Sequence, residues 1–269
     1  MSALVESFEH PLLRKLRSTL IVLMLLVLVG LLTRPLEVPA WTEVRKAQVE
    51  MNLGDVEGAL GQGLVVGMLG GFRTIMADFL WIRLNTDWEK RDLVKVTALS
   101  KLVTTLDPRP DFFWINSARM TAYDMPNWRI REEGGYDAVP ESRQGELDRQ
   151  QAEQAFEILH RALSFHPDSP KLHLEMGQIY LNRLKDYENA AEWFLSASEL
   201  PGAPYYAARI YGELLRRQGK DYEAYVYYQQ LFRDLPDDPY AQHGTIYERI
   251  QELEEELNIP LFQRFVPED

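Results

Sequence analysis

The sequence predicts an all-α fold, a right-handed α-solenoid of about four helix pairs with a capping helix, preceded by one N-terminal transmembrane helix. Three observations support this prediction. A pattern of about 34 residues occurs twice between residues 169 and 236, Pro201 and Pro236 end the two copies, and an uncharged apolar run lies near the N-terminus. A repeat of two helices cannot bury its apolar face alone, so it indicates a stack of units.

The composition excludes several classes of function. The chain has 269 residues, of which 46% are hydrophobic, so it can bury a substantial core. Its 29 basic and 41 acidic residues leave a net charge of −12, which argues against nonspecific nucleic-acid binding because such binding depends on neutralising phosphates. Cysteine is absent, so disulfides and thiolate metal sites are excluded.

The uncharged run near the N-terminus predicts a transmembrane helix. Residues 18–33 (STLIVLMLLVLVGLLT) would span about 24 Å as a helix, a little less than the ~30 Å hydrocarbon core of a bilayer. Arg17 and Arg34 flank the run and can reach the two interfaces. We therefore expect a cytoplasmic N-terminus over residues 1–17 and a transmembrane helix over 18–34 that contacts membrane lipid.

The basic residues around this run predict its orientation. Arg14, Lys15 and Arg17 precede it, whereas only Arg34 follows closely, which favours an N-terminus inside the cell. In a bacterium the chain would then be a single-pass protein of the inner (cell) membrane, with its helical repeats in the periplasm. A cleaved signal peptide is the alternative, because small residues precede a cleavage point after Ala40.

The membrane-proximal linker, residues 35–68, leads into a glycine-rich helix. Residues 59–71 (ALGQGLVVGMLGG) carry no charge, and small residues recur in them at every fourth position. These small residues are Ala59, Gly63, Gly67 and Gly71. On a helix they would form one stripe that lets another helix approach closely. We favour packing on the first helix pair; a flexible loop and a segment lying against the membrane are the alternatives.

The repeat region is expected to divide into four units. Over residues 69–238, these are residues 69–108, 110–167, 170–203 and 205–238. In the first unit we expect helices over residues 69–84 and 92–105. In the second we expect helices that start at Pro110 and Asp148, with an insertion over residues 125–145 between them. The insertion is expected to be a loop that is either solvated or in contact with a partner.

The last two units repeat each other most clearly. Gly177 and Gly212 lie within helices, where glycine costs about 0.5–1 kcal/mol relative to alanine, and close approach of a second helix would explain that cost. Phe194 and Tyr228 lie 34 residues apart and are expected to fill the space between units. The two glycines lie 35 residues apart, so the first copy has one extra residue near positions 182–185.

This pattern resembles the tetratricopeptide repeat family, in which a 34-residue unit forms two helices. The resemblance is clearest over residues 169–236 and extends to the more degenerate units before them. In the first unit, the residues GGFR followed by ADFLWIR are similar to a group of bacterial membrane-anchored repeat proteins without an established role. The resemblance implies that ligands bind the concave face formed by the first helices of the units.

The resemblance also implies which residues line a peptide-binding or partner-binding groove on that face. They are Arg119, Lys171, Gln178, Asn182, Tyr206, Arg209, Glu213, Arg216 and Arg217. Such a groove would be locally basic and aromatic, which suits an extended or helical peptide with acidic groups or a free carboxylate. The alternative is that its arginines pair with Glu213 and neighbouring acids. The asparagine that carboxylate-clamping members carry in this groove is missing, which argues against a chaperone-tail function.

Residues 239–269 are expected to form a capping helix and a tail. The helix should run from Pro239 to Leu257 and end before Pro260. The tail over residues 261–265 is expected to fold back onto the cap, with a short docking peptide as the alternative.

No residue pattern assembles an active site. His160, His166 and His173 lack the spacing of a helical metal pair, and no nucleophile motif occurs. We therefore expect no catalysis, no cofactor, no metal and no small-molecule substrate. The expected function is a membrane-anchored scaffold or adaptor for protein–protein interactions in a bacterial envelope complex. The alternative is a structural accessory subunit of a membrane transporter or of a secretion or pilus apparatus, packing through its glycine-rich and transmembrane helices.

Overall fold

The structure, a computed structural model, describes residues 72–267 together with Met24. Apart from Met24, the predicted transmembrane helix over 18–34 lies outside the described residues, as do the cleavage point after Ala40 and the glycine-rich segment over 59–71. Within the described part, no helix combines the length and the apolar character needed to cross a membrane.

The described residues form helices and the turns between them, without a strand, so the prediction of an all-α fold is confirmed. The α-helices are α4 (Arg73–Glu89), α5 (Leu93–Leu106), α6 (Asp111–Arg119), α7 (Met125–Glu132), α8 (Glu141–Phe165), α9 (Pro170–Ile179), α10 (Tyr187–Ser198), α11 (Tyr206–Arg217), α12 (Asp221–Asp234) and α13 (His243–Glu256). The π-helices are η1 (Met120–Asp124) and η2 (Tyr180–Leu184), and the 3-10 turns are η3 (Pro239–Ala241) and η4 (Leu261–Gln263).

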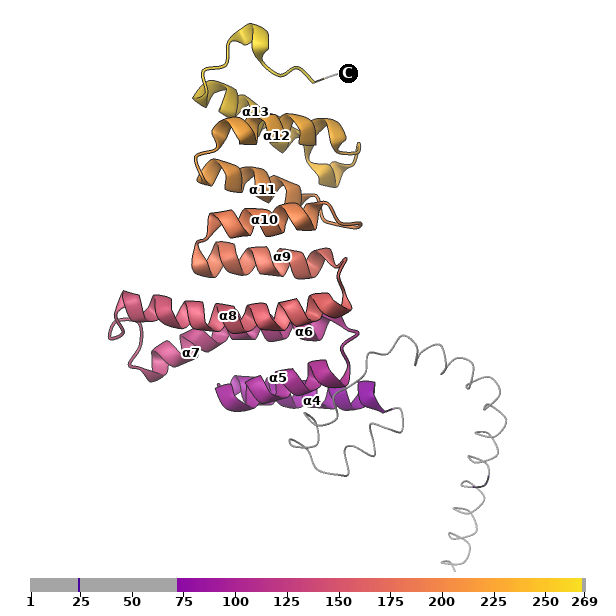
Figure 1. The fold of residues 1–269 in the computed structure, drawn as a ribbon, viewed down its shortest axis with the longest axis vertical. Coiled ribbons are helices and arrows are strands. Elements are labelled where there is room, and N and C mark those ends of the chain that lie inside the picture. The colour runs from indigo at the N-terminus through magenta and orange to yellow at the C-terminus, as the bar shows by residue number, and fades with distance from the viewer. Residues whose placement is uncertain (1–23, 25–71, 268–269) are drawn as a thin grey trace, which may run out of the picture. The chain divides into compact units, whose positions relative to one another are not determined.

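Helices that follow one another in the chain are also neighbours in space. α4 packs on α5, α9 on α10, α10 on α11, and α12 on α13, while α6 and α7 both pack on α8. Figure 1 shows the resulting stack, with α4 at one end and α13 at the other. Most packing in the described stack therefore joins segments that are close in sequence.

Short polar side chains and glycine determine where several helices begin and end. The carboxylates of Asp92 and Asp186 accept hydrogen bonds from the backbone N–H groups of Lys95 and Asn189, each at 3.1 Å, and so cap the starts of α5 and α10. Gly219 follows α11 with a φ of +73°, in the left-handed region that glycine adopts without strain. These boundaries follow from local sequence.

The prediction of a loop over residues 125–145 is wrong for most of that range. The first helix of this unit continues through η1 into α7, and the second helix begins at Glu141 instead of Asp148. Apolar burial explains the difference, because Ile130, Val139 and Leu147 form a small core of their own. The connection between the two helices is consequently short, and it comprises residues 133–140.

The extra residue expected near positions 182–185 is accommodated by a π-helix. η2 replaces the last turn of the first helix in this unit, and Lys185 then takes a left-handed φ of +55° before α10 begins. A π-turn closes hydrogen bonds from residue i to residue i+5, so it takes up one more residue than an α-turn. The equivalent place in the preceding unit holds η1, which is also a π-helix.

Gly177 and Gly212 mark a close approach of paired helices, as predicted. A Cβ atom on Gly177 would lie 2.9 Å from the Phe194 ring, and one on Gly212 would lie 2.5 Å from the Tyr228 ring. Both rings are buried, and the Tyr228 hydroxyl donates a hydrogen bond of 3.0 Å to the carbonyl oxygen of Arg209. The helix pairs can therefore pack this tightly only with glycine at these positions.

The tail folds back onto the last helices, as predicted, through Phe265. The ring of this residue is 8% exposed and lies 5.4 Å from the ring of Phe232, measured between centroids. Its backbone N–H donates a hydrogen bond of 2.6 Å to the buried carboxylate of Glu254, which also accepts one from the hydroxyl of Tyr225. This anchor closes the apolar core beneath α12 and α13.

Candidate partner-binding surface

The predicted groove residues of α6 and α9 lie side by side. Nε and Nη2 of Arg119 on α6 lie 2.8 and 2.7 Å from Oε2 of Glu175 on α9. Nearer the start of the same helices, Nζ of Lys171 lies 3.0 Å from a carboxylate oxygen of Asp111. Two ion pairs thus join the first helices of neighbouring units.

Glu175 is a buried acid at the centre of this surface. Only 1% of its side chain is exposed, whereas 51% of the Arg119 side chain is exposed. Burial raises the pKa of the Glu175 carboxyl, and the Arg119 guanidinium opposes that rise. Oε1 of Glu175 has no hydrogen-bond partner within the described part of the chain. The site therefore holds a carboxyl of which one oxygen pairs with Arg119 and the other accepts no hydrogen bond from the described residues.

Polar groups from η1 and η2 surround this pair. Burial and the nearby charge of Glu175 raise the pKa of Tyr123 to about 12, while a hydrogen bond with Asn182 opposes the rise. The guanidinium of Arg183 lies 6.0 Å from the centre of the Tyr123 ring and pairs with Asp148 on α8. Both π-helices thus contribute side chains to the same polar cluster.

Sequence reasoning missed Glu175 because it falls in an apolar run. Leu172, Leu174, Met176 and Glu175 are all buried on α9. A charged residue at such a position signals a buried ion pair, and Arg119 is its partner. The pairing could not be identified beforehand, since the two residues are 56 positions apart.

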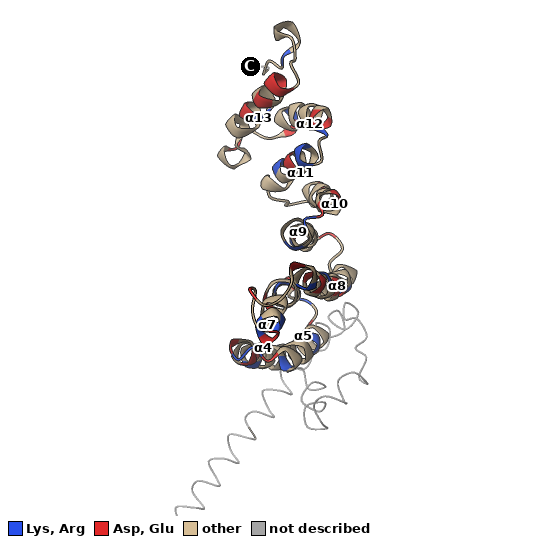
Figure 2. Cartoon of the chain, turned by 90° about the vertical axis from the view of Figure 1, so that its left-hand side faces the viewer, with Lys and Arg blue, Asp and Glu red and all other residues tan. Residues whose placement is uncertain are grey.

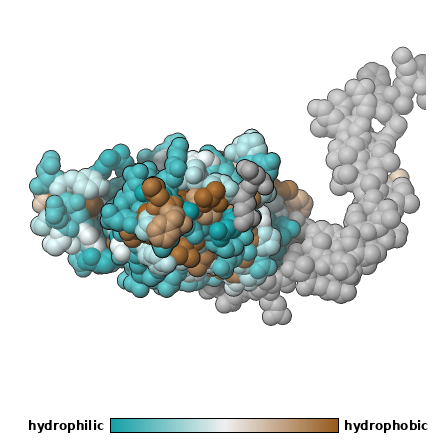
Figure 3. Space-filling view, turned by 90° about the horizontal axis from the view of Figure 1, so that it is seen from above, coloured by the Kyte–Doolittle hydropathy of each residue, from teal (hydrophilic) through white to brown (hydrophobic). Residues whose placement is uncertain are grey.

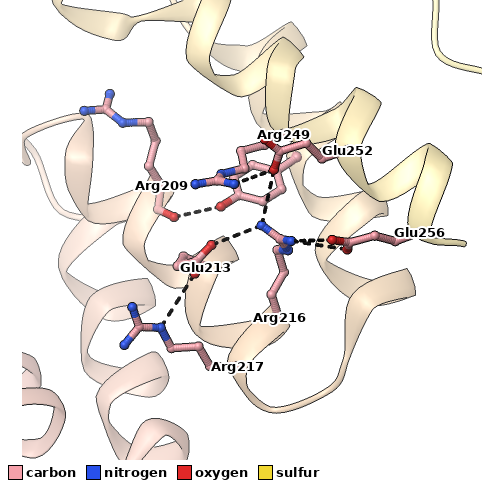
Figure 4. A network of polar contacts seen from close by, with 8 residues as sticks. Arg209, Glu213, Arg216, Arg217, Arg249, Glu252 and Glu256 are labelled. Carbon is pink, nitrogen blue, oxygen red and sulfur yellow. Dashed lines mark hydrogen bonds and ion pairs between the residues drawn. The ribbon is translucent and has the colours of Figure 1, made fainter.

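Three predicted groove residues of α11, Glu213, Arg216 and Arg217, belong to a separate network, shown in Figure 4. The Arg216 side chain is 17% exposed and pairs with Glu213 at 3.5 Å, Glu252 at 3.6 Å and Glu256 at 2.9 Å. Glu252 also pairs with Arg249, its neighbour on α13. Acids from its own helix and from the capping helix therefore neutralise Arg216.

The other two arginines of α11 are also engaged. Arg217 pairs with Glu213 at 3.6 Å, and its guanidinium lies 5.6 Å from the centre of the Tyr187 ring. The guanidinium of Arg209 points away from this network (Figure 4) and donates a hydrogen bond of 3.2 Å to the carbonyl oxygen of Ala241. The contacts of Arg216 and Arg217 thus follow the alternative in which the arginines pair with acids, and the arginines of α11 do not form a shared basic groove.

The other five residues of the predicted groove lie on α6, α9, η2 and the start of α11. Lys171, Asn182 and Tyr206 are exposed, and Gln178 is half-buried. We define the partner surface by the five residues Arg119, Lys171, Gln178, Asn182 and Tyr206.

Two surface cavities in the described part of the chain are lined by residues other than these five. A surface cavity of about 360 Å³ is lined by Trp88, Asp124 and Trp128 among others, and one of about 380 Å³ lies beside Tyr205 and Tyr227. Between residues 72 and 267, no group of three or more His, Asp or Glu side chains is placed to hold a metal ion. The five residues of the partner surface therefore line neither of these two cavities.

The three histidines that cluster in sequence contact other residues, and the rings of His160 and His173 both lie beside the ring of Trp193, at 6.1 and 5.3 Å between centroids. His166 Nε2 lies 2.9 Å from the carbonyl oxygen of Pro108, and His173 Nδ1 lies 2.9 Å from the hydroxyl of Ser196. Both rings therefore have structural partners.

Comparison with protein-family models finds no family that matches this chain, and comparison with curated proteins finds no similar relative.

Proposed function

We propose that the chain is a membrane-anchored scaffold of the tetratricopeptide-repeat type, which binds a segment of a partner protein in a bacterial envelope complex. The observation that carries this proposal is the pairing of Arg119 on α6 with Glu175 on α9, because it brings the exposed polar residues of successive first helices onto one face. The 34-residue period, the glycine contacts and the stacking of consecutive helices support a repeat array.

The chemistry of the partner surface favours a peptide segment with hydrogen-bonding groups and an acidic side chain. Arg119 and Lys171 offer positive charge, and Tyr206 offers an exposed ring at the edge. Gln178 and Asn182 can both donate and accept hydrogen bonds, as a peptide backbone requires. Arg216 is 17% exposed and contacts three acids, whereas Arg119 and Lys171 each contact one acid and are 51% and 70% exposed, so we place binding on this part of the array.

Charge and ring substitutions on the partner surface test the binding proposal. Lys171→Glu combined with Tyr206→Ala changes two exposed residues, so the fold should persist. When the full-length double variant is pulled down from native membranes and bound proteins are identified by mass spectrometry, the partner should be absent. Lys220→Glu makes the same charge change at an exposed residue outside the surface and should retain it. Equal recovery of partners with all the variants would refute this surface.

We further propose that the anchor is the segment over residues 18–34 and that the repeats lie in the periplasm. The support is the uncharged run and the excess of basic residues before it. A reporter that is active only outside the cytoplasm, fused after Asp269, should be active. An inactive reporter in a stable fusion would place the repeats inside the cell.

A further inference from the structure

Helix α4 has two apolar faces. Ala77, Trp81 and Leu84 are buried on the inner face, towards the rest of the stack. Large apolar side chains on the other face, here called the outer stripe, are half-exposed or more. They are Phe72 (56%), Ile75 (50%), Phe79 (64%) and Ile82 (63%). Their spacing of three or four residues places them in one line along the helix.

The outer stripe lies at an end of the stack, where an array of helix pairs needs a cover. The opposite end has one, because Ile246, Ile250 and Leu253 of α13 are buried while acids such as Glu252 and Glu255 face solvent. Repeat arrays need such terminal elements with a polar outer face to stay soluble. A contiguous line of four large apolar side chains is instead typical of a surface that another segment covers.

The chain itself provides a segment of matching length and chemistry. Residues 59–71 carry no charge and end immediately before Phe72. A helix over residues 59–69 would be about 16 Å long, and the stripe from Phe72 to Ile82 extends about 15 Å along α4. Gly70 and Gly71, between the two, tolerate the sharp turn that folding back requires.

The order of residues on either side of Gly71 also matches small side chains to large ones. Gly67 and Gly63 lie four and eight residues before Gly71, whereas Ile75 and Phe79 lie four and eight residues after it. In an antiparallel pair that turns at Gly71, each of these glycines would face one large side chain. A residue without a side chain opposite a large one allows two helices to approach closely.

We propose that residues 59–71 fold back along α4 and cover the outer stripe, with Gly67 against Ile75 and Gly63 against Phe79. This segment would close the first end of the array as α13 closes the other. Direct linkage favours it over a second copy of the chain, because a tethered segment has a millimolar effective concentration.

Cysteine pairs test this register, since the chain has no cysteine of its own. The variants Gly67→Cys/Ile75→Cys and Gly63→Cys/Phe79→Cys should form intramolecular disulfides in the full-length protein, because a disulfide needs Cα atoms within about 7 Å. The control pair Gly67→Cys/Val94→Cys uses an exposed residue on α5. It should give about tenfold less cross-linked chain, because the proposed register places residue 67 opposite residue 75 and not opposite residue 94.

Other occupants of the stripe would give different results. Disulfide-linked dimers of the single variant Phe79→Cys would show that a second copy covers it. Protection of that cysteine from a water-soluble thiol reagent only in the presence of lipid vesicles would show that a bilayer does. Equal yields from the control pair and the two matched pairs would mean that the segment has no fixed register. Each of these three results would overturn the proposal.

Discussion

At the scale of single residues, the Arg119–Glu175 pair decides the properties of the partner surface. A buried carboxyl with a raised pKa holds its proton more tightly in the folded chain than in the unfolded chain. The ionised form therefore opposes folding at pH values above the folded pKa, and this penalty disappears as the pH falls through that pKa. Arg119 reduces the penalty because it is the cation that Glu175 contacts.

Arg119→Ala should therefore destabilise the fold more in alkaline than in acidic solution. Loss of its partner leaves the Glu175 carboxylate buried and unpaired, which should cost about 1–3 kcal/mol near pH 8. Near pH 5 the cost should be smaller, since Glu175 is then closer to neutral. Urea unfolding at the two pH values measures the difference, with Lys171→Ala as a control in an exposed pair. Equal losses at both values would show that Glu175 does not titrate in this way.

Gly212→Ala should destabilise the fold even though alanine favours helices. The added Cβ would lie 2.5 Å from the buried Tyr228 ring, and overpacking of this kind costs about 1–3 kcal/mol. Gly244→Ala is the matched control, because nothing lies within 4 Å of a Cβ at that position of α13. Thermal unfolding of both variants should show a loss for the first and no loss for the second. A stable Gly212→Ala variant would mean that α11 and α12 can separate easily.

At the scale of secondary-structure elements, the last helices depend on a residue outside any helix. Phe265 packs on Phe232 of α12 and on Tyr247 of α13. Its backbone N–H donates a hydrogen bond to the carboxylate of Glu254, which is 2% exposed. Without Phe265 in place, this buried carboxylate would have one hydrogen-bond donor fewer. The tail therefore holds α12 and α13 together.

Phe265→Ala should cost about 3 kcal/mol, since it removes a buried ring and leaves a cavity. Phe262→Ala is the matched control, because this neighbouring ring is 85% exposed, and it should change stability by less than about 0.5 kcal/mol. Chemical denaturation of the two variants distinguishes the two roles. Equal stability of both would show that the tail contributes nothing to the cap.

At the scale of the whole molecule, the described helices form a chain of interfaces between neighbours. Separate apolar clusters join α6 with α8 and α9, α9 with α10 and α11, and α11 with α12 and α13. In such an array, stability is the sum of units and of contacts between adjacent units. Damage at one end should therefore stay local.

Ile250→Ala should loosen the end of the stack while the centre stays protected. Ile250 is fully buried on α13 and packs in the cluster with Tyr225 and Tyr228. Hydrogen exchange should then speed up in α12 and α13 but not in α6 and α8. Leu159→Ala on α8, also fully buried, should give the reverse pattern. Uniform loss of protection in either variant would show that the stack unfolds as one unit.

The sequence alone determined those features that depend on local spacing. Apolar periodicity predicted an all-α chain. A glycine at the corresponding place in both copies of the repeat predicted that a second helix approaches closely at Gly177 and Gly212. The one-residue difference between the two copies predicted an extra residue near positions 182–185, and the structure accommodates it in the π-helix η2. Each feature follows from backbone geometry over a few turns of helix, which the residues of that stretch largely control.

Only the tertiary structure decided which side chains meet across units. Arg216 pairs with Glu256, 40 positions away, so the basic groove predicted on α11 is neutralised by the capping helix. Arg119 finds Glu175 at a separation of 56, and the loop predicted over residues 125–145 is mostly helical because Ile130 meets Leu147. Charges and apolar side chains select partners by distance in space, and that distance depends on how successive helix pairs stack.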